Sequence, residues 1–162
     1  MPEVCNFEEI LSEILAVRRR VSVARAALQE ICRILVDRVP HYNWVGFYLV
    51  DSKRSKELIL GPFEGAPTEH VRIPFGAGIC GQAAEKRKIF VVPNVERESN
   101  YLACSPDVKS EIVLPIFKGE RLLGELDIDS HTTAAFTPAD QAFLQEICQL
   151  SSEWLEQLNE LI

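Results

Sequence analysis

The sequence predicts an α+β domain in which amphipathic helices at both ends of the chain enclose a run of short strands. Apolar residues recur at helical spacing over about 7–39 and again over about 138–161. The core between them, about 42–136, carries segments rich in aromatic and β-branched residues, separated by turns. Because hairpin turns join successive strands, we expect a mainly antiparallel central sheet. The terminal helices should cover one face of this sheet and leave the other for a ligand pocket.

The first helical pattern admits two interpretations, two helices or one helix bent near Arg20–Ser22. Ser22 belongs to a residue type that caps helix starts, and Pro40 cannot continue a helix. We therefore expect the second piece to be capped by Ser22 and to end before Pro40. The basic cluster Arg18–Arg20 falls inside the pattern and is interpreted as a solvated helix face.

The strands are predicted from alternation and from turn residues. WVGFYLV at 44–50 and ELILGPFEG at 57–65 form one hairpin, HVRIPF at 70–75 is a short strand, and a glycine-rich loop then opens a helix around Gly81–Lys86. Residues 89–92 form a brief strand, and a long polar connection spans 93–109. EIVLPIF and RLLGELDID form a second hairpin, and Thr137 with Pro138 opens the last helix.

Length and composition indicate one domain over residues 1–162 and exclude several classes of protein. The 17 basic and 24 acidic residues give a formal net charge of -7, which disfavours nucleic acid as a partner. No apolar stretch approaches the ~20 residues of a membrane span, so no membrane partner is expected. The N-terminus lacks the basic and apolar regions of a secretory signal, so we expect a cytoplasmic protein.

The cysteines do not form a recognisable framework. Their number, five, is odd and no CxxC pair occurs, so we expect mostly free thiols in a reducing compartment and no zinc knuckle. Cys32 and Cys148 lie at apolar helical positions and are interpreted as core residues. Cys80 follows the tight glycine-rich turn, which would bring it close to a ligand. Cys104 lies in a polar loop where a thiol can react.

Acidic residues share one side of a predicted strand. Strand alternation places Glu125, Asp127 and Asp129 on one face, and Glu111 opens the neighbouring strand. A solvated acidic face is the simplest interpretation. If this face coincides with that of Trp44 and Tyr48, however, the sheet carries an aromatic wall beside clustered acids. One of these acids should then titrate high and serve as a proton donor.

Three further features could carry chemistry but give weak signals. The Asp127 and Asp129 pair has ligand atoms that suit Mg²⁺ or Mn²⁺, yet we expect neither a metal nor a cofactor. The turn GAGICG lacks the order of a phosphate-binding loop. His70 is either a pocket residue or a strand end, whereas His41 and His131 are expected in surface loops.

Several segments, taken in order, resemble the free methionine-(R)-sulfoxide reductases, a family with a GAF fold. These are NWVGFYL, LGPFEGAP, VRIPFGAGICG, the loop ending in AC at residue 104, SEIVLPI and GELDIDS. The resemblance covers the chain from about Tyr42 to the final helix. It implies that Cys104 is the catalytic cysteine and Cys80 a second active-site cysteine. It further implies pocket acids at Glu111, Asp127 and Asp129 and an aromatic wall at Trp44 and Tyr48.

The resemblance also implies a reaction. The Cys104 thiolate would attack the sulfoxide sulfur of free methionine sulfoxide while one of the pocket acids supplies a proton to the oxygen. Methionine would leave, and the sulfenic acid on Cys104 would condense with a second thiol. A thioredoxin-like reductant would then reduce the disulfide. Trp44 would pack on the methyl group of the substrate.

One position departs from the family. Members commonly carry a further cysteine, the usual resolving thiol, where this chain has His70, and the loop reads NYLACS rather than GHIACD. Three outcomes follow: Cys80 resolves the sulfenic acid, an external thiol does so, or turnover has been lost. The alternative function is therefore a non-catalytic module that binds a small ligand or senses redox state. The long amphipathic terminal helices also suit the pairing of two copies into a homodimer.

Overall fold

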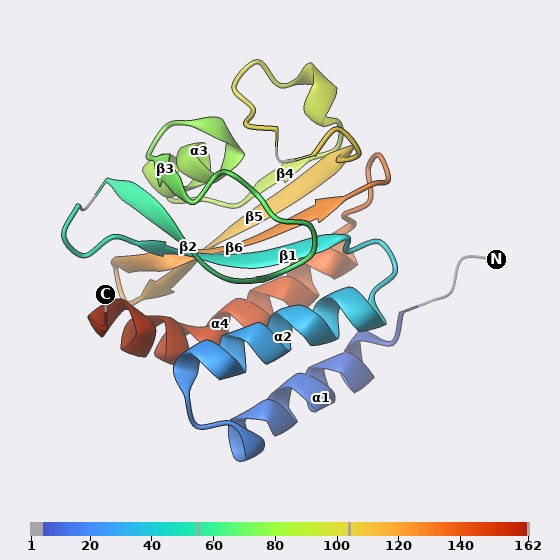
Figure 1. Ribbon diagram of the computed structural model, residues 1–162. Coiled ribbons are helices and arrows are strands. Elements are labelled where there is room, and N and C mark those ends of the chain that lie inside the picture. Colours follow the sequence, from blue (N-terminus) through green and yellow to red (C-terminus); the bar gives the residue numbers. More distant parts are fainter. Residues whose placement is uncertain (1–4, 55, 104, 162) are drawn as a thin grey trace.

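The computed structural model describes residues 5–54, 56–103 and 105–161. Within them, one sheet contains the strands in the order β3-β2-β1-β6-β5-β4, and each pairing is antiparallel (Figure 1). The expected α+β fold with a mainly antiparallel sheet is confirmed. The strands are β1 (Trp44–Val50), β2 (Glu57–Glu64), β3 (Arg72–Pro74), β4 (Phe90–Val92), β5 (Ser110–Lys118) and β6 (Arg121–Ser130).

The long helices lie on one face of the sheet, as expected, but in two layers. They are α1 (Phe7–Arg20), α2 (Ala24–Arg38) and α4 (Pro138–Glu160). Helices α2 and α4 pack directly on the strands, whereas α1 packs on α2 and α4 and forms an outer layer (Figure 1). None of the described helices is both long and apolar enough to cross a bilayer.

The predicted start of α2 at a Ser22 cap is wrong, whereas the predicted start of α4 at Thr137 and Pro138 is confirmed. The first pattern is two helices, and the residue that precedes α2 is Val23, whose side chain makes no capping hydrogen bond. Ser22 therefore does not cap α2, because the chain stays extended for one residue beyond it. At α4, Thr137 and Asp140 form a reciprocal capping box, and Pro138 occupies the first turn.

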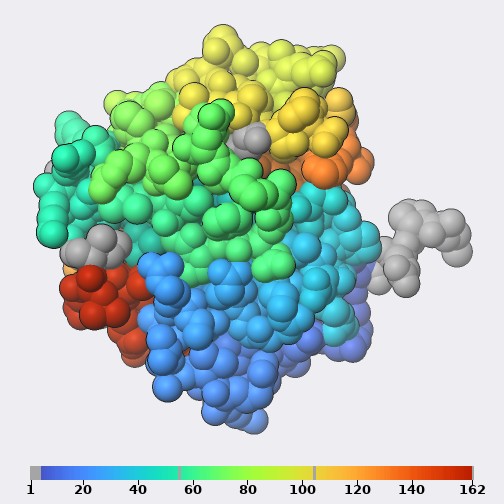
Figure 2. Space-filling view, viewed as in Figure 1, coloured from blue at the N-terminus to red at the C-terminus, as the bar shows by residue number. Residues whose placement is uncertain are grey.

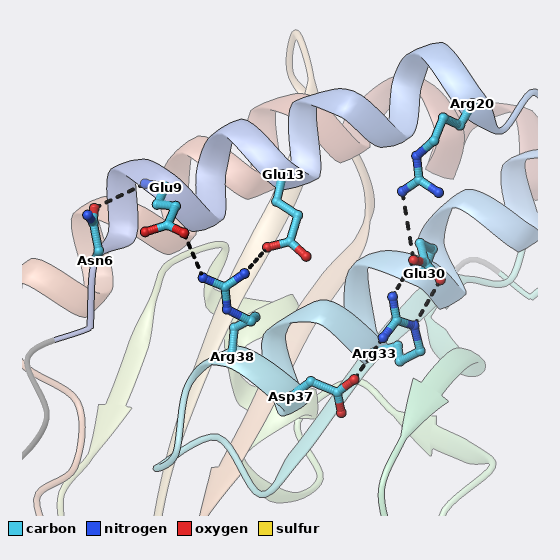
Figure 3. A network of polar contacts seen from close by, with 8 residues as sticks. All are labelled: Asn6, Glu9, Glu13, Arg20, Glu30, Arg33, Asp37 and Arg38. Atoms are coloured by element: carbon cyan, nitrogen blue, oxygen red, sulfur yellow. Dashed lines mark hydrogen bonds and ion pairs between the residues drawn. The ribbon is translucent and has the colours of Figure 1, made fainter.

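Charged side chains join α1 to α2 on the outside of the molecule (Figure 3). Arg38 reaches back to Glu9 at 3.3 Å and also pairs with Glu13, and Arg20 lies 3.8 Å from Glu30. Exposed pairs of this kind contribute little to stability. The association of α1 therefore depends mainly on its buried apolar stripe, Ile10, Ile14 and Val17. The expected solvated face at Arg18–Arg20 is confirmed, since these three residues are exposed.

The opposite face of the sheet is covered by shorter elements, which form the green and yellow upper part of the molecule in the space-filling view (Figure 2). Helix α3 (Gly78–Lys86) lies there, together with the connection that leads from β4 through the 3₁₀ turn η1 (Val95–Arg97) to β5 (Figure 1). The Asn100 side chain ties the connection to α3: its amide donates to Gly76 O at 2.7 Å, and its oxygen accepts from Gly78 N at 2.8 Å. A second apolar cluster, separate from the main core, packs between α3 and the sheet.

Candidate active site

The aromatic residues and the acidic residues lie on the same face of the sheet. Residues directly opposite one another in an antiparallel pair point to the same side. The register pairs Trp44 with Asp129, Gly46 with Asp127, Tyr48 with Glu125, and Glu111 with Asp129. The condition on which the sequence interpretation depended, that the two faces coincide, is therefore met. This face lies under α3 and the 93–109 connection.

The acidic face is buried, so its interpretation as a solvated surface is wrong. Glu111 is 5% exposed, and Glu125, Asp127 and Asp129 are between 0% and 2% exposed. Burial raises the pKa of each of these carboxyl groups. Repulsion from Asp127 raises the pKa of Glu111, Glu125 and Asp129 further. The cluster therefore retains protons at a pH where ordinary carboxyl groups have lost them.

Several oxygen atoms of the cluster have no hydrogen-bond partner among the described residues. They are both carboxyl oxygens of Glu125, Oδ1 of Asp127 and Oδ1 of Asp129. The Cys80 thiol lies close enough to Glu125 to lower the pKa of its carboxyl group, against the larger opposite effects of burial and of Asp127. Buried polar atoms are usually paired, so unpaired ones suggest a place for a ligand.

We expect the buried Glu125 to make stability depend on pH. The pKa of Glu125 in the folded protein lies well above the ordinary 4.5. Its contribution to the free energy of unfolding is therefore complete below the pKa of the unfolded state, and it is lost as the pH rises through the pKa of the folded state. The free energy of unfolding of the wild type should therefore fall as the pH rises above the ordinary range of a glutamic acid and through the raised folded pKa of Glu125. Glu125→Gln should reduce this fall, as measured by urea denaturation. Glu120→Gln, at an exposed position, is the control, and equal slopes in all three proteins would contradict the expectation.

A pocket of about 260 Å³, including its open mouth, lies over the acids. Its lining includes Tyr48, His70, Cys80, Leu102, Glu111 and Asp127. The sulfur of Cys80 and one carboxyl oxygen each of Glu111 and Asp127 lie within 4.8 Å of one another. The pocket therefore brings together a thiol and two carboxyl groups from α3, β5 and β6.

Glycines at the start of α3 allow Cys80 to approach the acids. Gly76 and Gly78 have φ angles of +91° and +63°, which other residues adopt at a cost. A Cβ on Gly78 would lie 2.8 Å from the Leu102 side chain, and one on Gly81 would lie 2.5 Å from Pro74 O. The tight turn predicted from the sequence is present. Helix α3 begins at Gly78, three residues before the predicted start, and this places Cys80 in its first turn.

The environment of Cys80 disfavours its thiolate. The side chain is 5% exposed, and its pKa is raised well above the usual value, first by burial and then by Asp127, Glu125, Glu111 and Asp129. Cys80 is therefore a protonated thiol in this pocket. Cys104, the predicted nucleophile, lies outside the described residues.

His70 lines the pocket. Of the two interpretations of its position, a pocket residue or a strand end, the first is therefore correct. Its Nε2 lies 3.0 Å from the carbonyl oxygen of Ala103, and its own carbonyl oxygen accepts a hydrogen bond from the Tyr48 hydroxyl at 3.0 Å. His70 thus connects β1 to the segment just before Cys104. Sequence spacing contained no signal for this contact.

Trp44 is held rigidly beside the pocket but does not line it. Its indole N–H donates to Ala66 O at 3.0 Å, and its ring stacks on Phe63 with centroids 5.5 Å apart. A Cβ on Gly46 would lie 2.3 Å from the ring, so only glycine leaves room for it. Asp129 likewise lies on the buried face without lining the pocket.

The remaining cysteines and histidines lie elsewhere. Cys32 and Cys148 are buried in the main core, as predicted, and His131 is exposed. His41 lies in a turn near the surface, as expected, but it is partly buried, because its Nε2 lies 2.7 Å from Asp140 Oδ1. Although burial raises the pKa of Asp140, hydrogen bonds from His41, Thr137 and Tyr42 lower it to about 2. This network fixes the start of α4.

Comparison with known proteins places this geometry in a family. The GAF domain family model matches residues 19–156. GAF domain-containing protein A of Dictyostelium discoideum is 38% identical over 90% of this chain and 89% of its own. The free methionine-R-sulfoxide reductase of Escherichia coli is 36% identical over 75% of this chain and 72% of its own.

A solved structure agrees with these sequence matches. The free methionine-R-sulfoxide reductase of Neisseria meningitidis in complex with its substrate is 36% identical and superposes with a TM-score of 0.86, covering 96% of this chain and 92% of that chain. The chain therefore belongs to the GAF domain family, and its relatives within that family include free methionine-R-sulfoxide reductases.

Proposed function

We propose that the protein reduces free methionine-(R)-sulfoxide to methionine with electrons from thiols. The observation that carries the proposal is the pocket in which Cys80, Glu111 and Asp127 lie within 4.8 Å of one another. Relatives named for this activity support the choice of substrate, since one of them was solved with its substrate bound. An oxidoreductase needs a thiol and a proton donor for this reaction, and the pocket contains both kinds of group.

In the proposed reaction, the Cys104 thiolate attacks the sulfoxide sulfur. A carboxylic acid protonates the sulfoxide oxygen, and the resulting hydroxyl group passes from the substrate sulfur to the Cys104 sulfur. The bond between the two sulfurs breaks, methionine leaves with the electron pair on its sulfur, and Cys104 is left as a sulfenic acid. A second thiol then condenses with the sulfenic acid and releases water. Two thiols of a thioredoxin-like donor reduce the resulting disulfide. The cytoplasm, where such donors keep thiols reduced, is the proposed compartment.

We assign different roles to the two acids that line the pocket. The pKa of Glu111 is raised well above its usual value, first by burial and then by Asp127 and Asp129, which suits a proton donor. The pKa of Asp127 is raised by burial but lowered by the neighbouring Glu111 and Cys80 groups. Asp127 is therefore the better anion for the substrate ammonium group. Asp129 supports these two acids, and Tyr48, which lines the pocket, contacts the apolar part of the substrate, with Trp44 on the same face of the sheet behind it.

Cys80 is the proposed resolving thiol, since the usual further cysteine is replaced by His70. Cys80→Ser should retain turnover with dithiothreitol and lose turnover with thioredoxin and thioredoxin reductase. Consumption of free methionine-(R)-sulfoxide, measured by chromatography with each donor, checks this expectation. Equal thioredoxin-dependent rates in the wild type and Cys80→Ser would assign resolution to an external thiol instead.

The same assay tests the whole proposal against the alternative of a non-catalytic module. The replacement of the family's usual further cysteine by His70 favours that alternative. Tight binding of methionine sulfoxide without turnover by either donor would replace the enzyme with a ligand-binding or redox-sensing domain. Turnover of the free (R) sulfoxide with at least one donor would support the enzyme.

A homodimer is proposed through the outer face of α1 and α4. Leu15 is 44% exposed there and lies beside a shallow groove that it shares with Leu11 and Leu150. Leu15→Glu should therefore convert a dimer into a monomer without loss of folding. Sedimentation equilibrium gives the mass directly. A wild type that sediments as a monomer would contradict this pairing.

A further inference from the structure

We propose that the pocket is also an inhibitory site for a borderline-soft divalent cation such as Zn²⁺, which displaces the protons of Cys80 and Glu111 into solvent and is bound by the Cys80 thiolate and by one carboxylate oxygen each of Glu111 and Asp127. These three ligand atoms lie within 4.8 Å of one another. In a tetrahedral zinc site with Zn–S about 2.3 Å and Zn–O about 2.1 Å, neighbouring ligand atoms lie roughly 3.5 Å apart. Side-chain rotations that move each atom by about 1 Å would close the site around the cation.

The unpaired oxygens beside these ligands are an independent observation that points to a cation. Glu125 is completely buried, neither of its oxygens has a hydrogen-bond partner among the described residues, and its carboxyl group acts electrostatically on the Cys80 thiol. One oxygen of Asp127 and one of Asp129 are unpaired in the same way. The described residues that line the pocket include no lysine or arginine. A bound cation would offset this concentration of buried acidic groups.

The donor atoms select the kind of cation. Mg²⁺ and Ca²⁺ prefer oxygen ligands, six or more in number, whereas a thiolate combined with two carboxylates suits Zn²⁺. The site thus differs from the Asp127 and Asp129 pair that the sequence alone suggested for a hard cation, because α3 adds the sulfur of Cys80. A fourth tetrahedral position remains for water or for an oxygen of Glu125 or Asp129.

Inhibition follows from the overlap with the proposed active site, and this part of the inference rests on the proposed function. The cation would bind Cys80, which is the proposed resolving thiol. It would also bind Glu111, the proposed proton donor, and Asp127, the proposed partner of the substrate ammonium group. Zn²⁺ should therefore compete with methionine sulfoxide, and a chelator should restore activity. The binding of the cation itself does not depend on turnover.

Cobalt titration of the reduced whole protein tests the site without an activity assay. Co²⁺ should produce a thiolate-to-cobalt charge-transfer band and the visible spectrum of a tetrahedral site, and Zn²⁺ but not Mg²⁺ should abolish both. Cys80→Ser should lose the charge-transfer band. Asp127→Asn should weaken Zn²⁺ binding by at least about tenfold, since changes to outer-shell groups alone cost about 10–100-fold.

The controls separate Cys80 from the other thiols. Cys148→Ala and Cys32→Ala, at thiols buried in the main core on the other side of the sheet, should both retain the cobalt band. A band that survives in Cys80→Ser would overturn the proposal, as would the absence of a band in the wild type. Circular dichroism checks that each variant is folded. A cobalt band in a protein without reductase activity would support the cation site while rejecting the proposed enzyme.

Discussion

Replacement of Cys104 by serine is expected to abolish reduction of free methionine-(R)-sulfoxide with either thiol donor. In the proposed reaction this sulfur forms the bond to the substrate sulfur and carries away the oxygen, and a hydroxyl group cannot replace it as nucleophile or as sulfenic acid. Loss of a nucleophile commonly costs several orders of magnitude, so the rate should fall by at least about a thousandfold. Substrate consumption by single-turnover chromatography measures this without the regeneration steps.

Two matched variants make the Cys104 result interpretable. Cys5→Ser, at a partly buried position near the N-terminus, and Cys148→Ser, on the buried face of α4, also remove one thiol each. Both should reduce the substrate in a single turnover at the wild-type rate. A substantial single-turnover rate in Cys104→Ser would show that another thiol attacks the sulfoxide. The mechanism would then have to be rebuilt around Cys80.

The elements that sequence reasoning predicted well are those determined by neighbours along the chain. Alternation and turn residues located β1 to the residue, and the Thr137 and Pro138 pair located the start of α4. The outer position of α1 could not be predicted, because α1 and α2 are both amphipathic and periodicity does not reveal which one contacts the sheet. The contact between His41 and Asp140 was missed because these residues lie 99 positions apart.

In the candidate site, too, the features determined by neighbours along the chain were predicted, and those that depend on distant contacts were not. Alternation predicted that the acids share a face, and the resemblance predicted which residues matter, but neither could predict how deeply the face is buried. That burial depends on α3 and the 93–109 connection folding over the sheet. Asn100, which ties these two segments together, was not identified because asparagine in a polar loop is common. Burial changes the chemistry of the site, since it converts a set of ordinary acids into potential proton donors.

Glu111→Gln is expected to lower the turnover number by about 10²–10⁴-fold while changing the Michaelis constant little, because general-acid catalysis contributes about this much. The buried carboxyl group of Glu111 lines the pocket and is within 4.8 Å of Cys80 and Asp127. Asp127→Asn should show the opposite division, a raised Michaelis constant and a smaller effect on turnover, because an uncharged amide no longer pairs with the substrate ammonium group. Steady-state kinetics with dithiothreitol separate the two effects.

The pH profile tests which acid carries the proton. Because the folded pKa of Glu111 is raised, its protonated form persists above the usual range of a glutamic acid and is lost as the pH rises through the raised value. The wild-type rate of sulfoxide reduction should therefore have a falling alkaline limb that Glu111→Gln lacks. Glu120→Gln, in the exposed turn between β5 and β6, should keep the limb. If the limb persists in Glu111→Gln and disappears in Asp127→Asn, the two roles are exchanged, and the proton reaches the sulfoxide from β6 rather than from β5.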